Sequence, residues 1–199
     1  MRSPWAREYA RTPSTYIWGT AASSLAREVS ALLPAGARVL DLGCGEGRDS
    51  VFFATVGCHV TGVDVSWAGL RKAERLAREN GVAVRWIQGD MSRVKVHGPF
   101  DLIYSCGSIH YVPRVERTPL FRRLKALTRP GGYHAHIVFT DGLVYVEKGE
   151  VVEHFTPGEL AAAYADWVIV RQVDRLISCA QDGTPHRHSV EEFIVKAVS

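Results

Sequence analysis

The chain has 199 residues, of which 46% are hydrophobic and 23% are charged, and this composition is typical of one globular domain rather than of a disordered chain. The formal net charge is only +3 with dispersed basic residues, which disfavours a nucleic-acid partner. No segment approaches the roughly 18 consecutive apolar residues of a membrane helix, and the charged N-terminus lacks a signal-peptide pattern, so we expect a cytoplasmic protein with no membrane partner.

Strand-like and helix-like segments alternate from residue 38 onward, which predicts an α/β fold with a parallel sheet and helices on both of its faces. The predicted strands are Arg38–Asp41, Cys58–Asp64, Val84–Gln88, Phe100–Ser105 and Tyr133–Thr140, the last one after a break at Pro130-Gly131-Gly132. The predicted helices are Arg48–Val56, Trp67–Asn80 and Thr118–Leu127.

The C-terminal third has a different order of predicted elements. Thr156-Pro157-Gly158-Glu159 has the pattern of a helix start, with a capping residue and a capping-box glutamate, and predicts a helix over Leu160–Asp166. Two strand-like segments follow, Trp167–Ala180 and His188–Val198, and the turn signal Gln181-Asp182-Gly183-Thr184 separates them. We therefore expect the chain to end in an antiparallel hairpin.

The segment Val39–Arg48 reads as a strand, a glycine turn and a helix start, which is the context of a nucleotide-cradling loop. Gly43 and Gly45 allow the backbone to approach a ligand closely. Arg48 stands where a dinucleotide-binding loop has its third glycine, and Asp41 would repel a pyrophosphate but attract a cationic ligand. These two residues favour S-adenosylmethionine (SAM), which has an ammonium and a sulfonium, over NAD, although an oxidoreductase stays an alternative.

Two further carboxylates follow the next strands. Asp64 ends the second strand, where an acidic side chain can accept hydrogen bonds from ribose hydroxyls. Asp90 ends the third strand, where it could bind the amino group of adenine while Met91 packs on the ring. Each element also occurs for structural reasons, but together they indicate one cofactor site at the carboxyl ends of the strands.

This set of residues resembles motifs I to III of the class I SAM-dependent methyltransferases. The resemblance implies a Rossmann-like fold with a seven-stranded, mostly parallel sheet, SAM as the cofactor and S-adenosylhomocysteine as the product. The cofactor contacts that it implies are Asp41, Gly43, Cys44, Gly45, Arg48, Asp64, Val65, Asp90, Met91, Cys106 and Trp18.

Further segments resemble the tellurite-resistance methyltransferases and their thiopurine-methyltransferase-like relatives. They are Arg48-Asp49-Ser50, where Asp49 departs from the group's asparagine, Trp5-Ala6-Arg7-Glu8-Tyr9, Trp18-Gly19-Thr20 and Phe155–Leu160. This likeness implies a small-molecule acceptor, either a chalcogen oxyanion or a thiol, amine or hydroxyl. It also implies a single domain with an aromatic lid or lead-in over 1–36, a SAM-binding core over 37–140 and a substrate-side helix and hairpin over 141–199.

Residues near the acceptor are expected from the end of the fourth strand and from the hairpin. His110 has the ordinary pKa of a general base, although packing of the next helix explains a histidine there equally well. Cys106 is expected to line the cofactor site rather than to act as a nucleophile. The residues predicted to face the acceptor are His110, Tyr111, His186, Arg187 and Tyr9, with Trp18 as a second lid residue.

Two His-x-His pairs, His134/His136 and His186/His188, suggest metal binding, but in the family's layout they lie at opposite ends of the sheet. We therefore expect no metal. The four cysteines lie far apart without a Cys-x-x-Cys pair, which indicates neither a zinc knuckle nor a disulfide framework. The sequence predicts a methyltransferase that is a monomer or a homodimer. A SAM-binding regulatory or assembly protein without turnover is the alternative.

Overall fold

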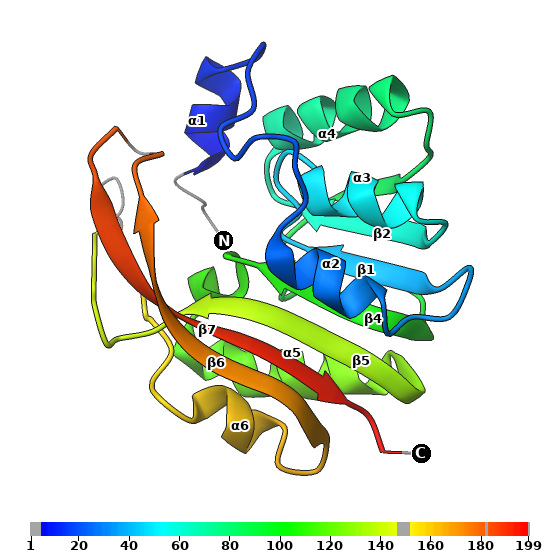
Figure 1. The fold of residues 1–199 in the computed structure, drawn as a ribbon, viewed down its shortest axis with the longest axis vertical. Coiled ribbons are helices and arrows are strands. Elements are labelled where there is room, and N and C mark those ends of the chain that lie inside the picture. The colour runs from blue at the N-terminus through cyan, green and yellow to red at the C-terminus, as the bar shows by residue number, and fades with distance from the viewer. Residues whose placement is uncertain (1–4, 147–151, 182, 199) are drawn as a thin grey trace.

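The computed structural model describes residues 5–146, 152–181 and 183–198. Seven strands form one sheet in the order β3-β2-β1-β4-β5-β7-β6, in which β1 to β5 are parallel and β7 is antiparallel to both β5 and β6 (Figure 1). The strands are β1 (Arg38–Leu42), β2 (His59–Asp64), β3 (Arg85–Gln88), β4 (Phe100–Cys106), β5 (Thr128–Phe139), β6 (Val168–Cys179) and β7 (His186–Lys196). The predicted α/β fold with a C-terminal antiparallel hairpin is confirmed.

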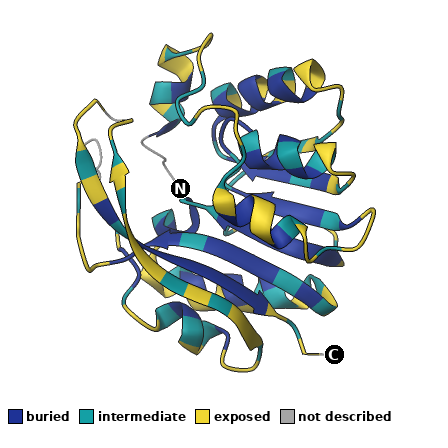
Figure 2. Ribbon diagram, in the orientation of Figure 1, coloured by how far each residue is buried: buried dark blue, intermediate teal, exposed yellow. Residues whose placement is uncertain are grey.

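Helices cover both faces of the sheet. They are α1 (Trp5–Arg11), α2 (Ser24–Ser30), α3 (Arg48–Thr55), α4 (Trp67–Glu79), α5 (Arg114–Ala126) and α6 (Glu159–Ala163), with a single 3-10 turn, η1 (Ile109–Tyr111). Side chains alternate across a strand, so Val39 packs under α2 and α3 whereas its neighbour Leu40 packs under α5 and α6. Figure 2 shows the result, with buried residues along the central strands and exposed residues along the edge strand β6.

Three element boundaries differ from the predictions by three residues or more. β5 begins at Thr128, because Thr128 already pairs with Phe100 and the glycines that suggested a break produce only a shift of register before Tyr133. α5 begins at Arg114 rather than at Thr118, since Glu153 accepts the backbone N–H of Arg114 at 2.7 Å and caps an earlier first turn. α6 is shorter than expected and ends at residue 163.

Two other expectations concern the ends and the turns of the chain. Glu159 accepts the backbone N–H of Thr156 at 3.1 Å, which is half of the predicted capping box, whereas Asp182 of the predicted hairpin turn lies outside the described residues. The division into lead-in, core and hairpin parts stays a prediction. The longest helices, α4 and α5, have 13 residues each, and over the described ranges no helix combines the length and apolarity that a bilayer crossing requires.

The first His-x-His pair lies in a fully buried polar chain between β5 and α6. The Tyr164 hydroxyl is 2.6 Å from His134 Nδ1 and 2.9 Å from His136 Nε2, so it donates to one imidazole and accepts from the other. The outer ring nitrogens meet Thr128 and Ser105, each at 2.8 Å. Burial lowers the pKa of His136 to about 3, so the chain consists of neutral groups that satisfy one another. The pair therefore has a structural role in this chain of hydrogen bonds.

Replacing the hydroxyl that joins the two imidazoles should therefore be costly. We predict that Tyr164→Phe lowers the free energy of unfolding by about 2–4 kcal/mol, because two buried nitrogens lose their partner at once. Urea denaturation followed by circular dichroism measures the change. Tyr133→Phe is the matched control, since Tyr133 is only partly buried, and it should shift stability by less than about 0.5 kcal/mol. Equal stabilities of the two variants would contradict the network.

Candidate active site

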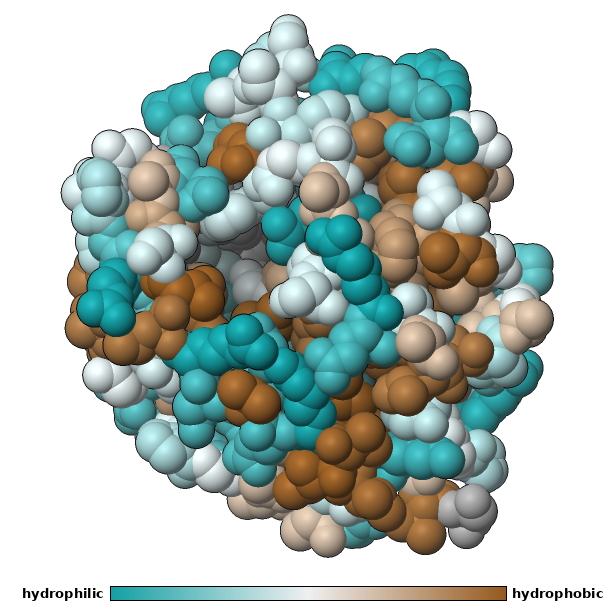
Figure 3. Space-filling model, viewed as in Figure 1, coloured by the Kyte–Doolittle hydropathy of each residue, from teal (hydrophilic) through white to brown (hydrophobic). Residues whose placement is uncertain are grey.

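A cavity of about 220 Å³ lies at the carboxyl ends of β1, β2 and β4. One wall is the glycine loop that follows β1, and another is formed by α1 and the segment after it. The third wall comes from the ends of β4 and β5 and from the outer end of the β6–β7 hairpin, which Figure 1 shows rising from the sheet on the side of α1. The space-filling view in Figure 3 is hollowed between these parts. Open α/β sheets place their ligands at this edge.

The glycine loop has a conformation that only glycine adopts readily at three of its positions. Gly43, Gly45 and Gly47 have φ values of 69°, 54° and 86°, in the left-handed region. A Cβ on Gly43 would lie 2.3 Å from Ser108 Cβ, and one on Gly45 would lie 2.8 Å from the hydroxyl of Tyr9. The loop is tied to the end of β2, where the amides of Gly43 and Cys44 both donate to the carbonyl of Val63 at 2.7 and 3.0 Å.

Three buried carboxylates surround this loop. Asp64 accepts the backbone N–H groups of Gly45 at 2.9 Å and Ser66 at 2.7 Å. Asp49 accepts a hydrogen bond from the hydroxyl of Tyr104 at 2.9 Å and one from the backbone N–H of Ser23 at 2.7 Å.

Asp41 differs from these two carboxylates in its partners. It accepts the Ser50 hydroxyl at 2.6 Å, and burial, with the neighbouring Asp49 and Asp64 charges, raises its pKa to about 7. Its negative charge is thus incompletely compensated in the described structure, and Asp41 lines the cavity.

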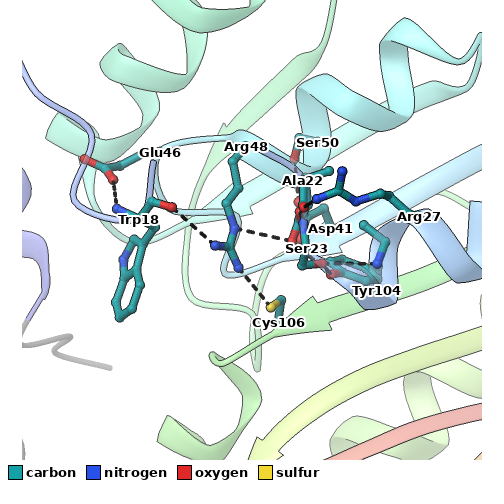
Figure 4. Close-up of polar contacts among 12 residues, drawn as sticks. Trp18, Ala22, Ser23, Arg27, Asp41, Glu46, Arg48, Ser50, Tyr104 and Cys106 are labelled. Atoms are coloured by element: carbon teal, nitrogen blue, oxygen red, sulfur yellow. Dashed lines mark hydrogen bonds and ion pairs between the residues drawn. The ribbon is translucent and has the colours of Figure 1, made fainter. Parts of the chain in front are cut away.

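Arg48 connects the N-terminal segment to the end of β4. Its guanidinium donates to the carbonyl of Trp18 at 3.3 Å and to the sulfur of Cys106 at 3.4 Å, and it lies 3.7 Å from Asp49 (Figure 4). Burial raises the pKa of Cys106 to about 11, so its thiol is protonated at neutral pH. This agrees with a lining role for Cys106 rather than a nucleophilic one.

Aromatic side chains of the N-terminal segment cover the glycine loop. The Tyr9 hydroxyl accepts the indole N–H of Trp18 at 3.2 Å, and the rings of Trp5 and Trp18 are in edge contact at 4.6 Å. Trp5 also donates to the hydroxyl of Tyr111 at 3.0 Å, across the cavity. These four residues all line the cavity, and together we name them the aromatic cover.

A buried ion pair fixes this cover to the rest of the protein. Glu46 of the glycine loop pairs with Lys72 of α4, and the two residues are each only 3% exposed. Glu46 also accepts the backbone N–H of Trp18 at 3.3 Å, and Lys72 donates to the hydroxyl of Thr12 at 3.3 Å. The backbone carbonyl of Lys72 accepts the Tyr16 hydroxyl at 3.2 Å. Both partners of the pair thus hold the N-terminal segment.

His110 does not line the cavity. It is 1% exposed and stacks on Phe139 at 4.2 Å, while the backbone N–H of Phe139 points to its Nδ1 at 3.4 Å. Phe139 lines the cavity and therefore lies between His110 and the site. Burial, and then the neighbouring His154 and Arg117, lower the pKa of His110 well below its ordinary value. This placement supports a packing role for His110 rather than the role of a general base.

Most of the other predicted site residues meet in the cavity. Lining it are Tyr9, Trp18, Asp41, Gly43, Cys44, Gly45, Arg48, Asp64, Val65, Met91, Cys106 and Tyr111. Asp90 does not line it, and its Oδ1 accepts hydrogen bonds from Ser92 instead. Arg187 is exposed, because it alternates with His186 and His188 along β7 and therefore lies on the other face of the strand.

Several lining residues escaped the sequence analysis. They include Glu46, Asp49, Phe139 and Cys179. Glu46 lies within the glycine loop and Asp49 just after it, so both could have been included by proximity alone. Cys179 could not have been predicted to line the cavity. It lies there because it pairs with His186 across the hairpin, and the register of the two strands depends on the turn between them.

Known proteins share both the sequence pattern and the fold. A family model described as a methyltransferase domain matches residues 39–132. A ubiquinone biosynthesis O-methyltransferase of Ralstonia nicotianae is 34% identical over 108 residues, which are 53% of this chain and 43% of that protein. The chain spans about half the length, or less, of the curated relatives it matches.

Solved structures agree with this match. TehB from Haemophilus influenzae superposes with a TM-score of 0.78 at 18% identity, over 97% of this chain and 65% of that chain. The N-methyltransferase NodS from Bradyrhizobium japonicum, solved with S-adenosyl-L-homocysteine, has a TM-score of 0.73 at 15% identity, over 99% and 100% of the two chains. Residues 39–132 therefore match a methyltransferase domain, and they contain the glycine loop and the carboxylates of Asp41, Asp49 and Asp64.

The buried ion pair between Lys72 and Glu46 can be tested by substitution. Lys72→Met should lower the free energy of unfolding by about 3–5 kcal/mol, because Glu46 would stay buried without its counter-charge. Adding Glu46→Gln to this variant should restore most of the loss. Arg93→Met is the control, since the Arg93–Glu116 pair is exposed, and it should change stability by less than about 1 kcal/mol. A double variant as unstable as Lys72→Met would contradict the pairing.

Proposed function

We propose that this protein binds SAM in the cavity, transfers its methyl group to a small-molecule acceptor and releases S-adenosylhomocysteine. The observation that carries the proposal is the buried Asp41 beside the glycine loop, because a carboxylate with a raised pKa at this position favours a cationic ligand. The family match and the NodS complex with S-adenosyl-L-homocysteine support the same ligand.

The cavity offers a partner for each part of SAM. Asp41 lines the cavity and would bind the ammonium group, and Asp64, at the end of the neighbouring strand, would accept hydrogen bonds from the ribose. Gly89 and Met91 line the cavity after β3, where Met91 can pack on the adenine ring. Asp90 lies beside them but outside the lining, so its predicted contact with adenine would require a change of side-chain orientation.

The chemistry requires little beyond positioning. The acceptor attacks the methyl carbon in line with the sulfonium sulfur, the new bond forms as the carbon–sulfur bond breaks, and the electron pair returns to the sulfur. Holding two reactants in line supplies several kcal/mol of the acceleration. The aromatic cover encloses the cofactor side of the cavity, so we infer that it excludes water and limits the acceptor to a small molecule.

The acceptor is proposed by chemical class. The relatives named O-methyltransferases match about half of the chain, and the likeness to TehB is one of fold. We therefore propose a thiol, hydroxyl, amine or chalcogen oxyanion as the acceptor. Incubation with methyl-labelled SAM and a panel of these acceptors, tellurite and selenite included, tests it. Transfer to any acceptor excludes the alternative of a SAM-binding protein without turnover, whereas cofactor binding with no transfer to any acceptor would favour it.

Cofactor binding should depend on pH through Asp41. Protonated Asp41 cannot pair with an ammonium group, so with a pKa of about 7 the affinity for S-adenosylhomocysteine should rise about tenfold between about pH 6 and pH 8. Calorimetric titration measures this rise. Asp41→Asn should bind more weakly and lose the rise over this range. Asp101→Asn should keep it, because Asp101 begins β4 at the opposite end of the sheet. A pH profile unchanged in Asp41→Asn would count against this role.

Turnover should not depend on His110 as a base. We predict that His110→Asn keeps the rate of methyl transfer within about threefold, because the asparagine oxygen can still accept the N–H of Phe139. Loss of a true general base would reduce the rate by about 100-fold or more. The rate at saturating SAM is the measurement, and a loss of that size in a folded variant would return His110 to the catalytic set.

A further inference from the structure

The outer end of the β6–β7 hairpin brings together a thiol and two imidazoles. Cys179 pairs with His186 across the hairpin, and His188 follows on the same face of β7. The Sγ atom of Cys179 and one ring nitrogen of each histidine all lie within 4.8 Å of one another. From the sequence we expected no metal, since the two His-x-His pairs lie apart. They do lie apart, but the hairpin register adds a cysteine to the second pair.

Neighbouring groups orient both histidines toward this cluster. His186 Nδ1 is 2.6 Å from the carbonyl of Thr184, which only accepts, so the Nδ1–H donates and the lone pair of Nε2 faces His188. The ring of Tyr145 stacks on His186 at 3.6 Å, and Phe139 stacks on His188 at 4.1 Å. In metal-binding histidines, the ring nitrogen that does not bind the metal characteristically donates its N–H to a partner such as a backbone carbonyl, as His186 does here.

The spacing suits an ion of the zinc class. The two Nε2 atoms are 2.8 Å apart, whereas two nitrogens bound to one tetrahedral Zn²⁺ would lie about 3.3 Å apart, so a small opening of the pair is sufficient. Cys179 Sγ lies 2.7 Å from Gln181 Oε1, to which the thiol donates, and the thiol would release its proton on binding the ion. One thiolate and two imidazoles form a ligand set that Zn²⁺ prefers.

The cluster borders the cavity. Cys179 and His188 both line it, on the side opposite the glycine loop and beyond Phe139. We propose that Cys179, His186 and His188 bind Zn²⁺ at the acceptor side of the cavity, with the fourth coordination position directed to an acceptor thiol. Metal binding stands on this geometry alone, and its part in methyl transfer rests on the proposed function.

The ion would activate the acceptor by acidifying it. A thiol that coordinates Zn²⁺ loses its proton to solvent, and the resulting thiolate attacks the methyl carbon of SAM. The new sulfur–carbon bond forms while the sulfonium bond breaks, so that the products are the methyl thioether and S-adenosylhomocysteine. This role replaces the general base that His110 cannot supply from behind Phe139.

Titration of the purified, metal-free full chain with Co²⁺ tests the site directly. We expect one equivalent to bind, with the visible absorption of tetrahedral cobalt and a near-ultraviolet thiolate-to-cobalt band, and Zn²⁺ to displace it. Cys179→Ser should abolish the thiolate band. His186→Gln should weaken the binding of Zn²⁺ by about 100-fold or more. Cys58→Ser and His59→Gln are the matched controls, since both residues lie outside the cluster and the cavity lining, and both should behave as wild type.

The same preparations separate this proposal from the proposed function. A thiolate band that persists in Cys179→Ser, or the lack of any Co²⁺ binding while S-adenosylhomocysteine still binds, overturns the metal site and leaves the methyltransferase proposal intact. Co²⁺ binding without S-adenosylhomocysteine binding overturns the proposed function and leaves the metal site intact. Methyl transfer to a small thiol should fall at least about tenfold on chelation and recover with Zn²⁺. Thiol methylation that is indifferent to the chelator overturns the role of the ion in activation.

Discussion

The burial of three carboxylates at one edge of the sheet is the constraint on which the site depends. Asp41, Asp49 and Asp64 lie close enough for the charges of the latter two to raise the pKa of Asp41. Burying negative charge is expensive unless it is paired or hydrogen-bonded. Asp64 is stabilised by backbone amides and Asp49 by a hydroxyl, an amide and the nearby Arg48, but Asp41 receives the hydroxyl of Ser50 and retains a pKa of about 7. A cationic ligand is the complement that this arrangement favours.

The same electrostatics explain why the N-terminal segment closes over the loop. Glu46 is a fourth acidic residue at the glycine turn, and it is buried because Lys72 accompanies it. The pair then holds Trp18 and Thr12 through their backbone and hydroxyl groups, which brings Tyr9 against Gly45. The aromatic cover thus follows from charge compensation as well as from apolar packing. A side chain on Gly45 would displace Tyr9, so the glycine serves the cover as well as the turn.

Local patterns in the sequence located the part of the cavity lining at the glycine loop and the ends of β1 and β2 better than the part after β4 and along the hairpin. Asp41 and Asp64 were found because each ends a strand in a regular βαβ succession, and succession alone brings strand ends to one edge. His110 was misplaced because whether a residue after β4 faces the cavity or the core depends on the 3-10 turn there. Asp90 was expected to contact adenine because it ends the third predicted strand, although only its neighbours Gly89 and Met91 line the cavity. Helix and strand ends differ from the predicted ones where contacts between distant residues decide them. For example, α5 begins at Arg114 because Glu153 caps it.

The hairpin side of the cavity differs physically from the glycine-loop side because it is built on the edge strand β6 and its neighbour β7. β6 is largely exposed, and the outer end of the hairpin contacts the rest of the protein through a few rings, chiefly the stack of His188 on Phe139. Its residues can therefore vary without disturbing the loop or the carboxylates, whereas a change at Gly43 would collide with Ser108. On the proposed function, selectivity for the acceptor would therefore reside in the hairpin. With His110 behind Phe139 and Cys106 protonated, the ring nitrogens of β7 would be the groups best placed to activate the acceptor.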